Sequence, residues 1–142
     1  MTENENWFPT EKNIEEYKLL KDMLSSQRIE YDLLSKKKVD GQLNSMKIKM
    51  VNRVLEPLKE ICKHEESYEF LDVLNEDEMP TYSDVVLIIS QFKTAISEFK
   101  SKYKIRDEFQ SAYRGYTVTR WMTQEFPPNY YEHEEEDEDE DV

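Results

Sequence analysis

The chain has 142 residues, of which 37% are hydrophobic and 36% charged, and its formal net charge is −13. This length suits one compact domain with tails, and nine Tyr, six Phe and two Trp exclude a chain that is disordered throughout. Nine acids lie in residues 132–141, so residues 1–131 carry a net charge of only −4 and the strong acidity is local to the C-terminal segment.

The scarcity of glycine favours an all-α fold. Gly41 and Gly115 are the two glycines, and each stands where a helical pattern stops, which suits a helix C′ position. The chain has no Asn-Gly pair of the kind that tight β-hairpins use. We therefore expect an N-terminal arm (1–9), a bundle domain of three to four helices (10–126) and a disordered acidic C-terminal tail (127–142).

The first predicted helix begins after Thr10, which can cap it, and runs to about Val39. Its apolar residues recur at spacings of three, four and seven, the period of one helix face. They are Ile14, Tyr17, Leu20, Leu24, Tyr31 and Leu34.

The second predicted helix begins near Gln42, and Pro57 should kink or restart it, because proline removes a backbone donor and clashes with the preceding turn. A short helical piece from Tyr68 to Leu74 can follow. The apolar stripe of the second helix consists of Leu43, Met46, Met50, Val54, Leu58 and Ile61.

The third predicted helix follows a loop over residues 75–80 and opens on Thr81, with Asp84 three residues later as in a capping box. We expect it to run to Tyr113 and to end before Gly115. Residues 116–126 favour neither a strand nor a helix. The stripe of this helix, the strongest in the chain, consists of Val85, Ile88, Ile89, Phe92, Ile96, Phe99 and Tyr103.

Little catalytic chemistry is visible in the sequence. Two isolated glycines cannot form a phosphate-binding loop. Cys62 and His64 offer two metal ligands where a closed zinc site needs about four. We expect no enzyme activity, no metal, no cofactor and no small-molecule substrate.

Basic and aromatic residues interleave in residues 100–121, a mixture that suits either a protein interface or contacts with nucleic acid. We favour a protein interface, because the acidic tail would repel nucleic acid from nearby surfaces. The predicted partner-binding residues of this stretch are Lys100, Lys102, Lys104, Arg106, Arg114, Arg120 and Trp121.

The acidic tail is the second predicted binding element, because long blocks of like charge stay extended and commonly act as interaction segments. It can bind a basic partner, cover the chain's own basic stretch, or sit beside DNA on a larger complex; it can also serve solubility alone. Its acids are Glu132, Glu134, Glu135, Glu136, Asp137, Glu138, Asp139, Glu140 and Asp141.

Trp7 and Phe8 precede the first helix cap, where two large aromatic side chains are costly to leave in water. They either pack on the chain's own helices as a hydrophobic staple or anchor the chain in a partner's pocket.

A helical body rich in Lys, Glu and Tyr (10–126) that ends in the tail EHEEEDEDEDV resembles the acidic-tailed accessory subunits of archaeal family-B DNA polymerase holoenzymes. The resemblance is one of layout. It implies a protein without catalytic activity of its own, a polymerase partner, and a tail that tempers strand displacement or DNA binding.

The expected function is therefore that of a non-enzymatic accessory subunit of a nucleic-acid-processing complex, with a protein partner that is basic or DNA-bound and with direct nucleic-acid binding weak or masked by the tail. The alternatives are an acidic chaperone for basic proteins, such as histones or ribosomal proteins, and a DNA-mimic inhibitor. One cysteine, no apolar N-terminal signal and no membrane-length apolar run favour a soluble intracellular protein, cytoplasmic or nuclear (nucleoid).

Overall fold

The computed structural model describes residues 7–128, and these are mostly helical, which confirms the all-α fold class. The four helices of this part are α1 (Glu11–Lys37), α2 (Ser45–Ile61), α3 (Tyr82–Tyr103) and the short α4 (Glu108–Arg114). Two 3₁₀ turns, η1 (Glu66–Phe70) and η2 (Glu76–Glu78), lie between α2 and α3, and strands β1 (Lys104–Arg106) and β2 (Thr119–Trp121) flank α4. The predicted tail lies outside the described residues.

The chain divides into two compact units, each described here by itself. The bundle unit is Glu15–Phe99, with most of α1, all of α2 and most of α3. The hairpin unit consists of the described parts of Met1–Ile14 and Lys100–Val142, with α4 and both strands.

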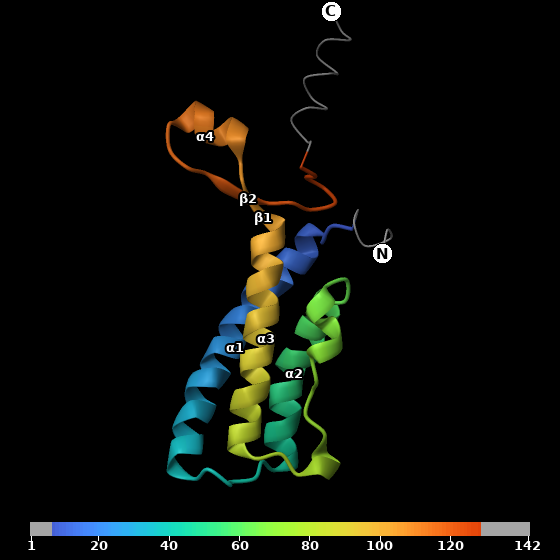
Figure 1. Ribbon diagram of the computed structural model, residues 1–142, viewed down its shortest axis with the longest axis vertical. Coiled ribbons are helices and arrows are strands. Elements are labelled where there is room, and N and C mark those ends of the chain that lie inside the picture. Colours follow the sequence, from blue (N-terminus) through green and yellow to red (C-terminus); the bar gives the residue numbers. More distant parts are fainter. Residues whose placement is uncertain (1–6, 129–142) are drawn as a thin grey trace, which may run out of the picture. The chain divides into compact units, whose positions relative to one another are not determined.

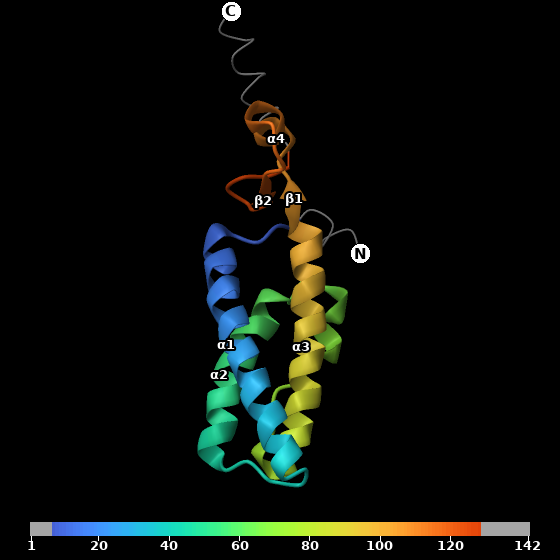
Figure 2. The same ribbon diagram turned by 90° about the vertical axis from the view of Figure 1, so that its left-hand side faces the viewer.

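Three helices running side by side make up the bundle unit, and α2 and α3 both run opposite to α1 (Figures 1 and 2). Every residue of the stripe predicted for α3 is buried except Ile88, which is half-buried. The α1 stripe is likewise buried apart from half-buried Leu34. The rings of Tyr17 and Phe99 join α1 to α3 with centroids 5.4 Å apart. The core is thus the meeting of apolar helix faces that the periodicity predicted.

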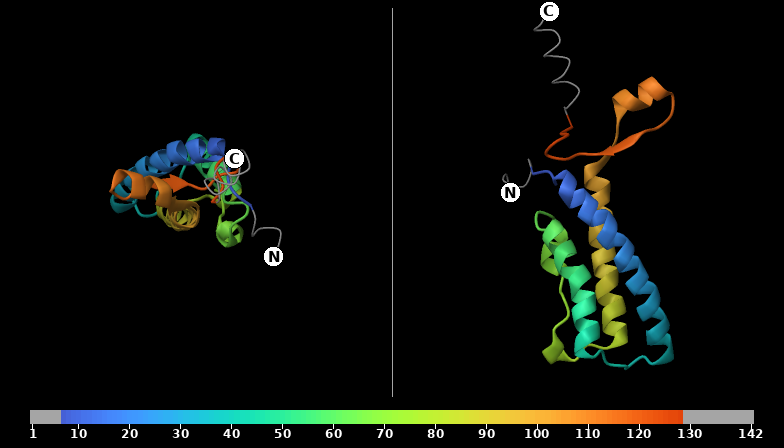
Figure 3. Two further views of the ribbon diagram at one scale, coloured as in Figure 1. Left: turned by 90° about the horizontal axis from the view of Figure 1, so that it is seen from above. Right: turned by 180° about the vertical axis from the view of Figure 1, so that it is seen from behind.

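The segment between α2 and α3 returns along the bundle beside α2 (Figure 3). It buries Leu71 and Leu74. The side-chain amide of Asn52 holds it, because Nδ2 donates to the Leu74 carbonyl and Oδ1 accepts from the Leu74 N–H, both at 2.9 Å. A polar residue on α2 thereby fixes a segment that has little regular structure of its own.

The predicted stripe of α2 is wrong at Met46 and Met50, although Leu43, just before the helix, is buried as expected. Met46 is 69% exposed and Met50 is exposed too, while Ile48 and Val51 are buried in their place. A row of residues spaced by four drifts about 40° per step around a helix, so Met46 lies about 80° away from Val54 and off the core face. The restart expected at Pro57 is also absent, because α2 continues through that proline to Ile61.

Gly41 is not the left-handed helix cap that the sequence suggested; Gly115 at the end of α4 is one, with φ 75°. Gly41 is needed for close packing instead. Its carbonyl accepts from the Tyr82 N–H at 2.8 Å, and a Cβ at this position would collide with the Tyr82 ring.

The predicted starts of the first and third helices are confirmed, whereas the second helix begins at Ser45, three residues after the predicted Gln42. Asp84 Oδ2 accepts from the Thr81 N–H at 2.8 Å and Thr81 Oγ1 from the Asp84 N–H at 3.3 Å, which is the reciprocal pattern of a capping box. Thr10 and Asn13 exchange the same pair of bonds at the start of α1, at 2.9 and 3.1 Å.

The prediction that α3 runs to Tyr113 is wrong. The helix ends at Tyr103, whose carbonyl accepts from the Met122 N–H at 2.7 Å, and the chain enters β1. The next position on the apolar face, four residues after Tyr103, is Asp107, which begins a separate helix as the N-cap of α4. The apolar stripe therefore ends where the helix ends.

Candidate functional site

The candidate site lies on the hairpin unit, in the stretch where the sequence predicts partner binding. Strands β1 and β2 pair antiparallel, with Lys104 opposite Trp121 and Arg106 opposite Thr119. Helix α4 fills the connection between them. This arrangement brings the two basic stretches of residues 100–106 and 114–120 onto one small scaffold.

Asp107 organises the scaffold, although it is an acid that is only 4% exposed. Its Oδ1 accepts from the Gln110 N–H at 2.9 Å and caps α4. Its own N–H donates to the Val118 carbonyl at 2.8 Å. Ser111, buried on the next turn, accepts from the Val118 N–H at 2.9 Å. Hydrogen bonds of Asp107 and Ser111 to Val118 therefore hold together the two ends of the connection that contains α4.

Arg120 belongs to the same framework. Its Nε lies 3.6 Å from Asp107 Oδ2, and its side chain is largely buried. The guanidinium also donates to the carbonyls of Phe126, at 2.9 Å, and Pro127, at 3.1 Å. The prediction that Arg120 contacts a partner stays untested, but its side chain already holds residues 126–127, which end five residues before the first predicted tail acid, Glu132.

The other predicted cations lie nearer the surface. Lys100, Lys102, Arg106 and Arg114 are exposed and Lys104 is half-buried. The Lys102 ammonium lies 5.1 Å from the Tyr103 ring centroid and the Lys104 ammonium 5.7 Å from that of Trp121, both within cation–π range. Trp121 is half-buried, so its predicted role as a contact residue is combined with a packing role.

The two arginines flank α4. Arg106 Nε lies 3.5 Å from Glu108 Oε2 in an exposed pair, and the Arg114 guanidinium donates to Gln110 Oε1 at 3.2 Å and to the Tyr116 hydroxyl at 3.3 Å. Exposed pairs of this kind are weak, so both guanidinium groups are available to exchange these contacts for those of a partner.

The aromatic residues that interleave with these cations in the sequence form an exposed surface, to which the structure adds Phe109. Tyr113 is 83% exposed, Tyr116 is exposed, and Phe109 is half exposed. Phe109 and Tyr113 are four residues apart on α4 and so share one face of it. The four-residue spacing of Phe109 and Tyr113 already indicates a shared helix face. The predicted continuation of the third helix to Tyr113 hid the fact that this face belongs to a separate, exposed helix. We call Phe109, Tyr113, Arg114 and Tyr116 the α4 surface.

Trp7 and Phe8 pack within their own unit. Their rings meet the Tyr103 ring edge-on, with centroids 5.6 and 6.4 Å away. Gln124 holds the same segment, because its Nε2 donates to the Phe8 carbonyl and its N–H to the Pro9 carbonyl, each at 2.9 Å. These contacts show that both rings pack on the chain's own helix, and the alternative role as a partner anchor stays a prediction.

The described part of the chain offers few residues for a metal site, a reactive thiol or a membrane-spanning helix. The predicted tail residues, from Glu132 to Asp141, lie outside it. Cys62 is a buried thiol at the end of α2. Between residues 7 and 128, no three His, Cys, Asp or Glu side chains are grouped so that they could hold a metal ion. No helix in that range is long and apolar enough to cross a membrane.

Comparison with known proteins returns no relative for this chain: no protein family, no curated protein and no solved structure matches it.

Proposed function

We propose that the protein is a non-enzymatic accessory subunit of a nucleic-acid-processing complex, which docks on a protein partner through the α4 surface and uses its acidic tail to weaken DNA or RNA binding nearby. The observation that carries the proposal is the exposure of Tyr113 and Tyr116 beside Arg114. Tyrosine and arginine dominate the binding energy of protein interfaces, and grouped exposed aromatics mark interaction sites.

The framework beneath the α4 surface supports docking. Asp107 and Ser111 tie both ends of the connection, so α4 needs little ordering when a partner binds. A surface that is already held in place loses less conformational entropy on association and keeps more of its contact energy as affinity.

The place where the tail begins supports the second half of the proposal. Arg120 binds the carbonyls of Phe126 and Pro127, and Glu132 follows Pro127 by five residues. Exposed charges more than roughly 10 Å apart hardly affect each other at 0.1 M salt, so a tail acts only on basic surfaces that it can touch. A chain of five residues spans at most about 18 Å, so Glu132 can act only on basic surfaces within that reach of Pro127.

Oligonucleotide titration tests the tail. A chain ending at residue 131 should bind a labelled DNA duplex at low salt, whereas the full chain should bind weakly. Five cations remain as candidate phosphate contacts once Arg120 is assigned to the framework: Lys100, Lys102, Lys104, Arg106 and Arg114. If all five meet phosphates, the log–log slope of affinity against salt should be about −4.5.

The matched control is Lys36→Gln with Lys37→Gln, two exposed cations at the end of α1 that should leave binding unchanged, whereas Lys102→Gln with Arg106→Gln should weaken it. If neither chain length binds at low salt, the tail does not mask the hairpin, and it acts on a partner's basic surface or serves solubility.

Docking is tested by purifying the complex from the native source with Tyr113→Ala and Tyr116→Ala. Leu33→Ala on α1, another exposed apolar side chain, is the control. A partner that is lost with the tyrosine variants and kept with the leucine variant identifies the docking surface. Retention of every partner by both would refute this role for α4.

A further inference from the structure

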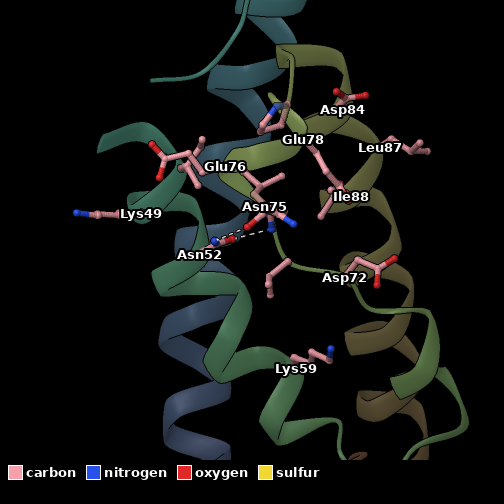
Figure 4. Close-up of a pocket in the computed structure, with 14 residues that line it drawn as sticks. Lys49, Asn52, Lys59, Asp72, Asn75, Glu76, Glu78, Asp84, Leu87 and Ile88 are labelled. Atoms are coloured by element: carbon pink, nitrogen blue, oxygen red, sulfur yellow. Dashed lines mark hydrogen bonds between the residues drawn. The ribbon is translucent and has the colours of Figure 1, made fainter. Parts of the chain in front are cut away.

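The bundle unit contains a groove on the face where α2, the segment after it and α3 meet. Its volume is about 890 Å³, and its walls come from α2, from the segment of residues 72–80 and from the first turns of α3 (Figure 4). A second hollow of about 290 Å³ borders it and shares three of its lining residues, Asp72, Leu87 and Ile88. The two hollows are therefore neighbours, with α3 residues in the wall of each.

Acids predominate among its lining residues. The main groove is lined by Asp72, Glu76, Glu78 and Asp84 against Lys49 and Lys59, and Glu69 lines the second hollow. The Lys59 ammonium is engaged with the Tyr68 ring, 5.3 Å from its centroid. In the part of the chain that the structure describes, no ion pair joins Asp72 or Glu78 to a lysine or arginine. The groove therefore presents uncompensated negative charge.

Apolar side chains also line the two hollows. Leu87 is 61% exposed, and Phe70 across the second hollow is similarly exposed. Ile88, which is half-buried, lines both hollows. An exposed leucine and phenylalanine beside a hollow provide a place where one apolar side chain of a partner can lose its water.

The acidic wall is held in shape before anything binds. The Asn52 amide fixes Leu74 through two hydrogen bonds, as the dashed lines in Figure 4 show. The Ser45 hydroxyl donates to the Glu76 carboxylate, and Asp84 is fixed by its capping bond to Thr81. Binding in such a groove costs little reorganisation of the protein.

We propose that this groove binds a basic segment of a protein partner, in which an apolar side chain of leucine size sits against Leu87 and Phe70 while flanking lysines or arginines meet Asp72 and Glu78. Charge complementarity selects this occupant. Nucleic acid and anionic lipid surfaces would be repelled by the same acids, and a small cation would leave the apolar wall without a role. The proposal concerns the bundle unit and is independent of the function proposed for α4.

The test measures fluorescence anisotropy of a labelled peptide, Lys-Arg-Leu-Lys-Lys-Leu-Arg-Lys, with the full chain at about 0.1 M salt, where the screening length is about 10 Å. A second peptide with serine in place of both leucines carries the same charge. The leucine peptide should bind at least about tenfold more tightly, a difference of about 1.4 kcal/mol, because only it can use the apolar wall.

Two variants locate the site, and each has a matched control on α1. Leu87→Ala should weaken the leucine peptide at least fivefold, roughly the loss expected when one apolar contact is removed, and Leu19→Ala, equally exposed, should not. Asp72→Lys should weaken both peptides, whereas Glu16→Lys, the same charge change at another exposed position, should have a much smaller effect. Amide chemical shifts should move at Phe70, Val73 and Leu87 on titration.

The acidic tail can also attract a basic peptide. The controls distinguish binding to the tail from binding in the groove. Equal binding of the leucine and serine peptides, equal effects of Asp72→Lys and Glu16→Lys, or shifts confined to residues 132–141 would each show that the attraction is general and that the groove is not the site. Any of these results overturns the proposal.

Discussion

The bundle unit and the hairpin unit are held together by different forces. The large apolar side chains that are fully buried lie mostly in the bundle, among them Phe92, Leu55 and Val85. The three polar residues that are buried in the described chain, Asp107, Ser111 and Thr123, all lie in the hairpin unit. Apolar burial is non-directional and tolerant, whereas buried polar groups require specific partners. The bundle therefore supplies stability, and the hairpin supplies one defined arrangement for α4.

The largest expected effect tests the bundle. Phe92→Ala should lower the free energy of unfolding by about 3–5 kcal/mol, because Phe92 is fully buried and its loss leaves a cavity. Urea unfolding followed by circular dichroism measures it. Leu33→Ala, at an exposed position of α1, should cost under about 0.5 kcal/mol. A loss of less than about 1 kcal/mol for Phe92→Ala would mean that the α3 stripe is not the core.

The second effect appears at alkaline pH and also concerns the bundle. Burial, aided by the nearby charge of Glu65, raises the pKa of the Cys62 thiol from 9.0 to about 12. The unfolded chain releases the thiol proton near pH 9 and the folded chain does not, so stability is full below pH 9 and falls as the pH rises toward 12. The slope should be about 1.4 kcal/mol per pH unit.

Urea unfolding at pH 8, 9 and 10 measures this slope, and Cys62→Ala should reduce it. Burial also raises the pKa of Tyr17 and Tyr31 above 10.0, so some alkaline loss should remain in that variant. A thiol reagent should leave Cys62 unmodified in the folded protein, since reagents attack the thiolate and the side chain is buried. Rapid modification at pH 8 would contradict the raised pKa.

The third effect is confined to the hairpin unit. Asp107→Ala removes the cap of α4 and the partner of Arg120, and should destabilise this unit by about 1–3 kcal/mol, the cost of leaving buried groups unsatisfied. Both tryptophans of the chain, Trp7 and Trp121, lie in this unit, so their fluorescence reports on it alone. Circular dichroism reports mainly on the bundle helices.

The two signals should therefore separate in the Asp107→Ala protein, with the tryptophan transition at lower urea and the helical transition near its original midpoint. A double-mutant cycle with Arg120→Gln isolates the ion pair. Equal shifts of both transitions would show that the polar ties of the hairpin also support the bundle, and the contrast between the units would fail.

The smallest effect concerns the α4 surface. Tyr113→Ala should change the free energy of unfolding by under about 0.5 kcal/mol, because the side chain is 83% exposed and alanine favours the helix. Tryptophan fluorescence during urea unfolding checks it. An unchanged free energy of unfolding would show that Tyr113 does not support the fold, as expected for a residue exposed for binding. A loss above about 1 kcal/mol would move Tyr113 into the packing of its unit.

Most of the bundle could be predicted from the amino-acid sequence, because helix periodicity and capping are local properties. The stripes of α1 and α3 and the capping pair Thr81–Asp84 could be found in windows of a few residues, and the structure confirms them. The stripe of α2 was ambiguous, since Met46 and Ile48 are both apolar and only packing against neighbours selects between two adjacent faces.

The hairpin, and with it the candidate site, depends on contacts between distant residues that the sequence pattern does not reveal. Residues 104–113 have a helix-compatible composition, and nothing local shows that Asp107 is buried against Arg120, thirteen residues away. Because of this long-range pair, Arg120 supports the fold of the hairpin unit and is not a free surface cation. Tyr113 and Tyr116 stay exposed on its surface. The acidic groove likewise depends on Asn52 holding Leu74, a contact across twenty-two residues that no helical period encodes, because hydrogen bonds between distant segments follow from packing rather than from local propensity.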